Sequence, residues 1–422
     1  MVDVERECAI VAARVERSFR SVRSILESRV WSSPRPLLHA LCMGVLRNYK
    51  LLVRLLRFCG YRGPVRGGRP EWWLPIVAAY EAVFRRGSVP LERLYRFLDE
   101  GVASCLRRVE PLDAVRGLGD RVERLSVAYS VPRWVVEKLL EALGGDYGRL
   151  ESVLKAFQEE QPIYIRFNRS LLSAEEALKL LSKHGIEAEP DPVLDDVLVV
   201  KRVSPGSVAR LPGNLFYIQD RSAALVAHVL GDAHGVVLDS FSAPGGKAGH
   251  VAWRRRGYVA ALDLSRRRLW DEKRLLSRQG VLHLVDPIQG DARKPPVGRA
   301  DAAIVDPDCS SIGRIGRSPE TRLFLEQSGP RIVERLSRLQ YEGLRAAAGI
   351  VKRGGVVVYS TCTLTLEENE GVVEKLLGEG LVELEDAGPW IGERSPRLPK
   401  TQRIYPDTAR CGGGFVARLR RV

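Results

Sequence analysis

The sequence predicts an α/β protein in three parts: an all-helical segment, a small α+β module and a doubly wound α/β domain. Its 422 residues are enough for about two to four domains. Apolar residues make up 45% of the chain, which excludes a mostly disordered protein. The hydrophobic pattern changes near residues 126 and 213, and we therefore predict domains at 1–125, 126–212 and 213–422.

The first segment is predicted to be helical and basic. Apolar residues recur at three- and four-residue spacing, with arginines between them, over residues 9–26, 36–59, 74–86 and 91–108. Residues 1–125 carry 23 Arg and Lys against 14 Asp and Glu, which is most of the chain's formal charge of +14. This concentration favours a face that binds a folded RNA, ahead of an anionic membrane surface. A solvated bundle whose arginines serve solubility is the alternative.

The middle segment changes character. Helical stretches at 133–143 and 148–157 precede a strand at 163–167, and a helix at 174–184 and a strand at 193–203 follow. A small α+β module is expected. Arg166 and Arg169 lie beside aromatic residues, so either they contact bases and phosphates or they belong to an ordinary strand surface.

The third segment alternates short apolar runs with amphipathic helices. Strands are predicted at 235–239, 258–263, 282–285, 301–306 and 355–360, and helices between them include 250–256, 265–278 and 331–351. This alternation predicts a parallel sheet with helices on both faces. Ligands of such a sheet bind at the carboxyl ends of its strands, near the switch in strand order.

Three predicted strands end in features that suit a nucleotide-like cofactor. The first leads into Gly245 and Gly246 before a helix, where a ligand can approach the backbone and meet free amide groups. Asp263 ends the second strand and suits a ribose diol, and Asp291 follows the third. Each acid alone is more often a cap or turn residue. Three such strand-end features in succession favour a cofactor site.

Two cysteines follow the fourth and fifth predicted strands. Cys309 lies in Asp306-Pro307-Asp308-Cys309, and Cys362 lies in Thr361-Cys362-Thr363. A single buried cysteine is usually a small apolar residue. A pair at adjacent strand ends, beside a cofactor site, instead favours a nucleophile or a redox pair.

These motifs resemble the RNA cytosine-5 methyltransferase family of the RsmB and NSUN type. The resemblance rests on Ala-Pro-Gly-Gly-Lys at 243–247, Asp306 with Cys309, Thr361-Cys362 and Glu-Asn-Glu at 368–370. The segments 216–220 and 413–419 are similar to the family's flanking motifs, and the match covers about residues 126–422. The helical segment resembles the NusB-like domain of the ribosomal-RNA branch.

The resemblance implies a Rossmann-like domain that uses S-adenosylmethionine to methylate carbon 5 of a cytosine in RNA. It implies Cys362 as the nucleophile, Cys309 as the residue that assists release, and Asp306 and Lys247 as further catalytic residues. The implied cofactor-binding residues are Phe241, Ser242, Ala243, Pro244, Gly245, Gly246, Lys247, Asp263, Asp291 and Asp306. Ribosomal RNA is the expected substrate, with transfer RNA as the nearest alternative.

Two positions depart from the family pattern. Phe241 stands where the family usually has cysteine, and Asp308 stands where it has proline. An acid next to Cys309 is expected to raise the pKa of that thiol. A non-catalytic RNA-binding assembly factor and a nicotinamide-dependent oxidoreductase are the remaining alternatives. The intact Cys362 argues against the first, and the missing GxGxxG argues against the second.

Other classes are not expected. The charged start (Asp3, Glu5, Arg6, Glu7) and the lack of a long apolar run predict neither a signal peptide nor a membrane-spanning segment. Seven scattered cysteines predict no disulfide framework, and six histidines without ligand spacing predict no metal. A cytoplasmic protein is expected, and the sequence is compatible with a monomer.

Overall fold

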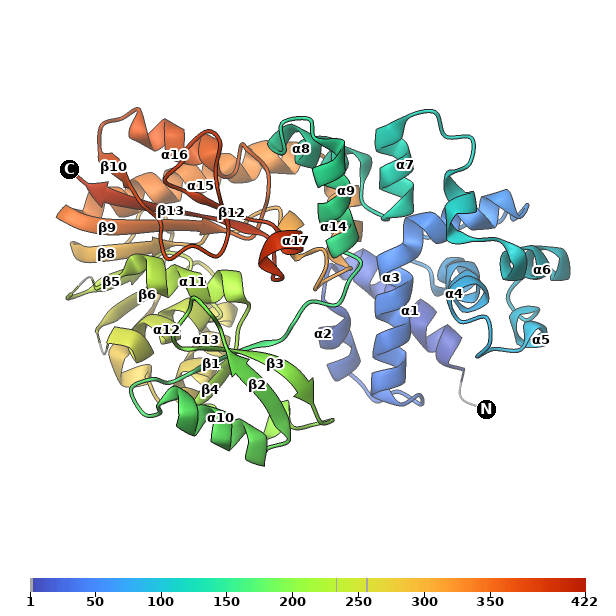
Figure 1. Cartoon of the computed structure of the whole chain (residues 1–422), viewed down its shortest axis with the longest axis horizontal. Helices are drawn as coiled ribbons and strands as arrows, with labels where there is room; N and C mark the ends of the chain where they lie inside the picture. Colours follow the sequence, from blue (N-terminus) through green and yellow to red (C-terminus); the bar gives the residue numbers. More distant parts are fainter. Residues whose placement is uncertain (1–2, 233, 256) are drawn as a thin grey trace. The chain divides into compact units, whose positions relative to one another are not determined.

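The computed structural model describes residues 3–232, 234–255 and 257–422. The chain forms two units (Figure 1). The helical unit comprises the chain up to Glu160 together with Arg314–Pro330, and the sheet unit comprises Gln161–Gly313 and Arg331–Val422. Among the described residues, no helix is both long enough and apolar enough to cross a membrane.

The helical unit packs around α1, α3 and α4, whose apolar faces supply Cys8, Leu52 and Trp73 to one core. The predicted helix at 9–26 is two helices, because Phe19 takes a left-handed φ of 53° and Ser21 caps the next helix. The helices of the unit are α1 (Val4–Ser18), α2 (Val22–Glu27), α3 (Arg35–Phe58), α4 (Pro70–Phe84), α5 (Leu91–Leu94), α6 (Glu100–Arg108), α7 (Arg121–Ala128), α8 (Arg133–Ala142), α9 (Tyr147–Ala156) and α14 (Thr321–Ser328).

Helix α14 belongs to the helical unit although it lies far along the chain. Leu323 is fully buried in the core of that unit. The buried Arg322 donates to the carbonyl oxygens of Ile315 and Phe157, and the Trp134 indole donates to the carbonyl of Leu325 at 3.1 Å. The chain therefore leaves the sheet unit after Gly313 and returns to it at Arg331.

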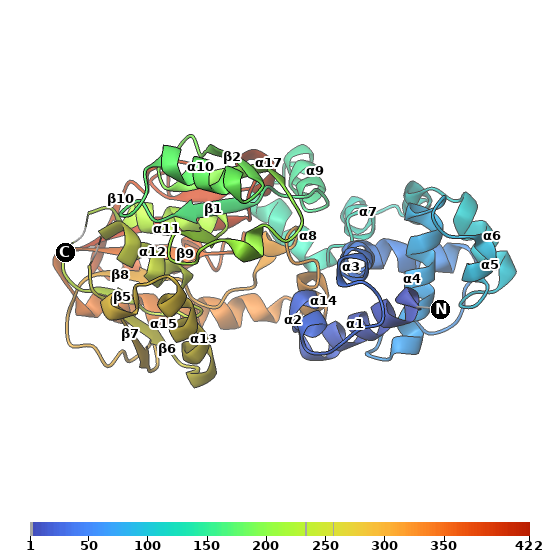
Figure 2. The same ribbon diagram turned by 90° about the horizontal axis from the view of Figure 1, so that it is seen from below.

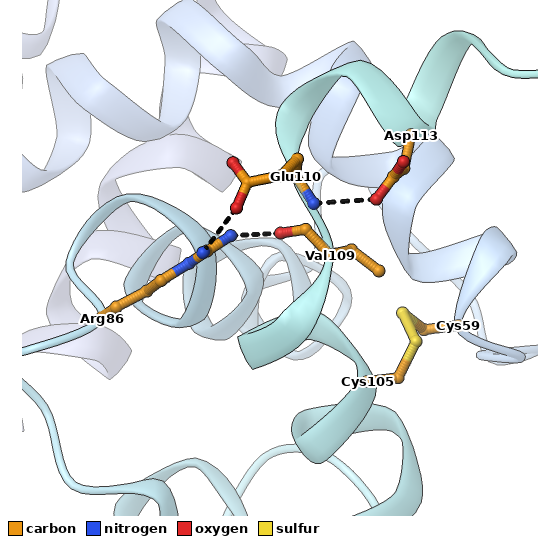
Figure 3. The surroundings of a disulfide bond; sticks show 6 residues. All are labelled: Cys59, Arg86, Cys105, Val109, Glu110 and Asp113. Carbon is orange, nitrogen blue, oxygen red and sulfur yellow. Dashed lines mark hydrogen bonds and ion pairs between the residues drawn. A yellow bond between two sulfur atoms is a disulfide. The ribbon is translucent and has the colours of Figure 1, made fainter.

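A disulfide joins Cys59, which follows α3, to Cys105 in α6 (Figure 3). The Cα atoms are 5.7 Å apart, and the two residues are 46 positions apart in the chain. Nearby, Arg86 donates to Glu110 at 2.8 Å and to the carbonyl of Val109. The sequence predicted no disulfide framework and did not identify this pair, because a spacing of this length carries no pairing signal.

The sheet unit begins with a four-stranded antiparallel sheet in the order β2-β3-β1-β4. Its elements are β1 (Tyr164–Phe167), α10 (Ala174–Lys183), β2 (Ile186–Pro190), β3 (Val197–Val203) and β4 (Phe216–Ile218). Ser173 and Glu176 form a capping box at the start of α10. Strand β2 was not predicted, since its alternating glutamates and central alanine give little apolar signal.

A nine-stranded sheet follows, in the order β11-β12-β13-β9-β8-β5-β6-β7, with β10 paired to β13. Strands β5 to β9 are mutually parallel, as predicted, and β13, a strand that was not predicted, pairs antiparallel to β9. The strands are β5 (Val237–Asp239), β6 (Val259–Asp263), β7 (Val285–Gln289), β8 (Ala300–Val305), β9 (Val351–Thr361), β10 (Val382–Glu385), β11 (Glu393–Arg394), β12 (Gln402–Ile404) and β13 (Gly414–Arg421). The predicted strand at 282–285 is a short 3-10 turn, and β7 begins only at Val285.

Helices cover both faces of this sheet. Alternate strand residues point to opposite cores: Val237 packs in one core with Val251 of α12, and Leu238 packs in the other with Leu344 of α15. Figure 2 shows α11 and α15 on opposite sides of the strands. The helices are α11 (Arg221–Leu230), α12 (Gly246–Arg255), α13 (Arg266–Arg278), α15 (Arg331–Ile350), α16 (Glu370–Leu377) and α17 (Pro406–Ala409).

The predicted helix at 250–256 starts at Gly246, and Arg256 lies outside the described residues. Strand order reverses at β5, which has β6 on one side and β8 on the other. The loops that follow β5 and β8 therefore leave the same edge of the sheet as neighbours, and such an edge is where ligands of doubly wound sheets bind.

Candidate active site

The loop after β5 is held in one conformation by α13. Ser242 donates to the buried carboxylate of Glu272 at 2.9 Å. Gly245 has a φ of +95°, and an added Cβ there would lie 2.9 Å from Cγ of Glu272. Only glycine meets both conditions, so the loop brings bare backbone to the carboxyl end of the sheet. Burial raises the pKa of Glu272 to about 7.

Arg166 fixes the start of α12 from the small sheet. Its side chain is fully buried and donates to the carbonyl of Gly246 and to Gln219, each at 2.9 Å. Its guanidinium lies 4.5 Å from the ring centroid of Trp253. Both sequence interpretations of Arg166, a nucleic-acid contact or a strand-surface residue, are therefore wrong: it is a buried support of the glycine loop. Arg169 is ion-paired to Asp195.

Asp239, the last residue of β5, is the acid that sequence reasoning did not select. It is 1% exposed, and no side chain of the described residues hydrogen-bonds to its carboxylate. Burial, reinforced by Glu272, raises its pKa well above the usual range. A buried acid without side-chain partners at a strand end is typical of a group that meets a polar ligand. Its position at the end of a buried apolar run was the available signal.

The two other strand-end acids differ in their surroundings. Asp263 is 4% exposed and accepts from the backbone N–H of Ser265 at 2.8 Å, and Arg268 lies 3.4 Å from its other oxygen. Arg268 also donates to the carbonyl of Ala243 at 2.6 Å, so it links the ends of β5 and β6. Asp291 is one-third exposed and is held by the guanidinium of Arg293. Hydrogen bonds from Arg293 lower its pKa.

Lys247 and Asp306 form an ion pair between the glycine loop and the end of β8. The other carboxylate oxygen of Asp306 accepts from Ser360 at 2.9 Å. Although burial opposes it, Asp306 raises the pKa of Lys247, so the lysine is charged at neutral pH. The predicted catalytic residues of these two loops are in direct contact.

Cys309 and Cys362 are brought together as the strand-end argument required. Their Sγ atoms are 3.0 Å apart, and both side chains are half-buried. Ser311, whose φ is +58°, lies with its Oγ 3.5 Å from Sγ of Cys362. The hydrogen bond with Cys362, followed by burial, raises the pKa of Cys309 well above its usual range. The geometry thus presents two thiols at one point above the sheet.

Asp308 does not cause that rise in the pKa of Cys309. Its side chain is 67% exposed and lies 3.5 Å from the guanidinium of Arg268. The pKa of the Cys309 thiol is raised by Cys362, by burial and by the charge of Glu368. The expected direction is confirmed, but the expected cause is wrong, because Arg268 and solvent offset the charge of Asp308.

Glu368 supports the loop that carries Cys309. Its buried carboxylate accepts from the backbone N–H of Ser310 at 2.8 Å, the hydroxyl of Ser310 at 2.5 Å, Thr365 at 2.9 Å and Gln340 at 3.0 Å. Gln340 also donates to the carbonyl of Asp308 at 3.1 Å. Sequence reasoning used Glu368 only for the family resemblance and gave it no position.

The next two residues support the loop that carries Cys362. Asn369 accepts from the hydroxyl of Thr361 at 2.6 Å and donates to the carbonyl of Thr363. Glu370 forms a fully buried ion pair with Arg403 of β12, which also donates to the carbonyl of Leu364 at 3.0 Å. The Glu-Asn-Glu segment at 368–370 therefore supports both cysteine loops through buried hydrogen bonds.

Asp196, His228 and His250 form a buried cluster that the histidine spacing did not predict. Each Nε2 lies 2.8 Å from an oxygen of Asp196. Arg254 occupies the same space: its Nη1 is 2.8 Å from Asp196 and 3.4 Å from Nε2 of His228. Burial lowers the pKa of His250 to about 3. Because the guanidinium of Arg254 occupies the position that a cation would take, we assign no metal to this cluster.

The fold and the site define a Rossmann-like methyltransferase that uses S-adenosylmethionine. The strand order, the glycine loop and the acids at the ends of β5, β6 and β8 are its features. A model described as 16S rRNA methyltransferase RsmB/F matches residues 228–420, and a model described as the ferredoxin-like domain of the RsmF/B-like methyltransferases matches residues 131–206. Both models describe domains of RsmB/F-type methyltransferases, and the chain is similar to them over these two ranges.

Individual relatives and solved structures are similar to the chain over most of its length. Ribosomal RNA small subunit methyltransferase B of Yersinia pestis is 28% identical over 381 residues, 86% of each chain. The crystal structure of PH0851 superposes with a TM-score of 0.78 at 23% identity, over 100% of this chain and 99% of its own. The structure of NSun6 from Pyrococcus horikoshii with SFG has a TM-score of 0.61 at 25% identity, over 69% of this chain and 98% of its own.

The residues present fit S-adenosylmethionine. The carboxylate of Asp239 has no side-chain partner in the described part of the chain, Asp263 has oxygens that can accept from a ribose, and the backbone at Gly245 admits no side chain. These are the groups that a ligand with hydroxyl and ammonium donors needs at the end of β5 and β6.

Proposed function

We propose that the protein transfers a methyl group from S-adenosylmethionine to carbon 5 of a cytosine in RNA, with ribosomal RNA as the favoured substrate. The observation that carries this proposal is the pair of thiols of Cys309 and Cys362, 3.0 Å apart beside the ion pair of Lys247 and Asp306. The name of the Yersinia pestis relative, a ribosomal RNA small subunit methyltransferase, supports the choice of substrate.

Carbon 5 of cytosine is a poor nucleophile, which explains why thiols are needed. The thiolate of Cys362 adds to carbon 6 and forms an Sγ–C6 bond, which makes carbon 5 electron-rich. When bound, S-adenosylmethionine supplies an electrophilic methyl group to carbon 5. S-adenosylhomocysteine is the leaving group. Solvent then takes the carbon-5 proton, the electron pair of that C–H bond forms the C5=C6 double bond, and the Sγ–C6 bond breaks to release the Cys362 thiolate, which regains the proton of nitrogen 3; Cys309 assists this release. As the adduct forms, nitrogen 3 takes up the proton released by the Cys362 thiol, and its N–H then donates to the carboxylate of Asp306, which Lys247 keeps in place.

The proposed cofactor contacts follow the strand ends. Asp263 holds the ribose, Asp291 lies at the adenine, and Asp306 lies near the methionine end. The loop contacts are assigned to Phe241, Ser242, Ala243, Pro244, Gly245, Gly246 and Lys247. Asp239 joins this set because its buried carboxylate has no side-chain partner.

The helical segment is proposed to bind the same RNA. We propose a NusB-like domain at 1–125, a module at 126–212 and a catalytic domain at 213–422, with the difference that the helices up to Glu160 and the segment Arg314–Pro330 pack in the helical unit. We place the reaction in the cytoplasm. The basic excess of residues 1–125 supports the RNA-binding part of this proposal.

The experiment incubates the protein with labelled S-adenosylmethionine and unmodified small-subunit ribosomal RNA. We expect 5-methylcytosine in the product, no transfer by Cys362→Ala, and a covalent protein–RNA adduct that accumulates with Cys309→Ala. Full activity of Cys362→Ala would refute its role as nucleophile. Label that enters transfer RNA but not ribosomal RNA would replace the substrate and keep the chemistry.

A further inference from the structure

We propose that a hollow at the end of α1 is a binding site for phosphate groups of the RNA backbone. This inference rests on the proposed function for the identity of the polyanion. The hollow has a volume of about 290 Å³. Its lining residues come from α1, from α2 and from the residues next to them: Arg14, Arg17, Ser18, Arg20, Ile25 and Ser28.

Among the residues that the structure describes, three guanidinium groups and no acid line this hollow. Neighbouring arginines of the helical unit are paired with carboxylates, including Arg6 with Asp3, Arg23 with Glu27, Arg66 with Glu16, Arg85 with Glu81 and Arg93 with Glu5. Within the described residues, Arg14, Arg17 and Arg20 have no carboxylate partner. Arg20 instead donates to the hydroxyl of Ser24 at 2.8 Å and to its carbonyl.

The two acids closest in sequence to the lining residues, Glu16 and Glu27, are directed elsewhere, and Glu27 is paired with Arg23. Glu16 is 6% exposed, and its carboxylate accepts from the backbone N–H groups of Gly67 and Gly68 and from the indole of Trp73 at 2.8 to 3.0 Å. The negative end of the α1 dipole is equivalent to only about half a charge, which three guanidinium groups outweigh. The hollow is therefore electropositive.

The backbone also orders one of the three arginines. An added Cβ at Gly68, whose φ is +75°, would lie 2.7 Å from Cγ of Arg17, so the stem of Arg17 rests directly on bare backbone. Guanidinium groups pair with phosphate in a bidentate manner. Phe19, between Ser18 and Arg20 in the chain, packs edge-to-face with Phe324 at a centroid distance of 5.3 Å, and its 46% exposed ring still offers surface on which an unpaired base can stack.

The test compares two triple variants of the full chain that lose the same net charge. The hollow variant is Arg14→Gln, Arg17→Gln and Arg20→Gln. The matched control is Arg6→Gln, Arg23→Gln and Arg116→Gln, three exposed arginines that already have acid partners. The probe is in-vitro transcribed small-subunit ribosomal RNA, and the dissociation constant is measured between 50 and 200 mM KCl.

We expect the slope of log K against log salt to fall by about two to three for the hollow variant, since each phosphate contact contributes about 0.7 to 0.9. The control should change this slope by less than half as much. Equal changes in the two variants would overturn the proposal, because general charge would then explain the binding. Circular dichroism and melting temperature check that each variant is folded.

A single substitution provides a second test if the triple variant does not fold. Ser28→Asp places a carboxylate in the hollow, and we expect RNA binding about fivefold weaker at 100 mM KCl or worse. Unchanged binding by Ser28→Asp would overturn the proposal. If the wild-type chain methylates RNA and the variants bind like it, only the hollow is refuted. If the wild-type chain and the variants bind RNA with the expected salt slopes but the wild-type chain transfers no methyl group, only the proposed function is refuted.

Discussion

Replacing Glu368 by glutamine removes a charge but keeps the shape of the side chain that supports Cys309. The carboxylate accepts four hydrogen bonds, two from N–H groups and two from hydroxyls. The N–H donors of Ser310 and Gln340 both meet Oε1 and cannot reverse, so the amide oxygen must take that place. The amide nitrogen then faces the hydroxyls of Ser310 and Thr365, which must turn from donors into acceptors.

The magnitude follows from these four bonds. A hydrogen bond to a charged group contributes about 1 kcal/mol more than a neutral one, and two bonds must also reverse. Burial raises the pKa of Glu368, which means that the buried charge itself destabilises the folded state. Removing this charge therefore recovers part of the lost free energy of unfolding. The net loss is about 2 kcal/mol, which lowers the melting temperature by about 4 to 8 °C for a unit of this size.

Calorimetry at pH 7.5 measures this effect, with Glu383→Gln on the exposed face of β10 as the control with the same charge change. We also expect a lower kcat with an unchanged KM for S-adenosylmethionine, because Glu368 supports the cysteine loop and not the glycine loop. Equal melting temperatures for the two variants would refute the supporting role of the carboxylate.

Three further outcomes are expected. Because the pKa of Glu272 is about 7 in the folded chain and near 4.5 when unfolded, its contribution to stability is full below pH 4.5 and is lost as the pH rises through 7. Denaturation of Glu272→Gln between pH 4.5 and 8 should lack this fall of about 3 kcal/mol, and an unchanged profile would contradict the assignment. Zinc chloride should not raise the melting temperature of the wild-type chain. Arg254→Met should open the cluster at Asp196, and zinc chloride should raise the melting temperature of this variant by about 3 °C. A rise in the wild type would show that the guanidinium does not exclude a cation. Asp308→Asn should leave the pH midpoint of Cys309 alkylation unchanged, as followed by mass spectrometry, and a clear downward shift would restore Asp308 as the cause of the raised pKa.

Residues that end buried strands could be predicted from the sequence. Asp263, Asp306, Cys309 and Cys362 each follow an apolar run, and parallel strands bring their carboxyl ends to one edge. The structure places Cys309 and Cys362 side by side for this reason. The same rule would have identified Asp239 as a site residue, but Asp239 was assigned to the strand that it ends.

Contacts between distant polar residues could not be predicted in this way. His228 and His250 meet Asp196 only because α11 and α12 pack beside the small sheet, and no spacing in the chain encodes that packing. The positions of Glu368 under Cys309 and of Arg166 under the glycine loop depend on packing in the same manner. Periodicity reports which face of an element is buried and not which partner it meets.

The placement of α14 in the helical unit has a consequence for synthesis of the chain. Residues up to Glu160 leave the ribosome first, yet their core lacks Leu323 until residue 330 has been made. At about 5 to 20 residues per second, this delay is about 10 to 30 s. During that interval the nascent helical unit exposes the apolar surface that α14 later covers, which is the situation in which chaperones bind. A fragment that ends at Glu160 is an incomplete folding unit for the same reason.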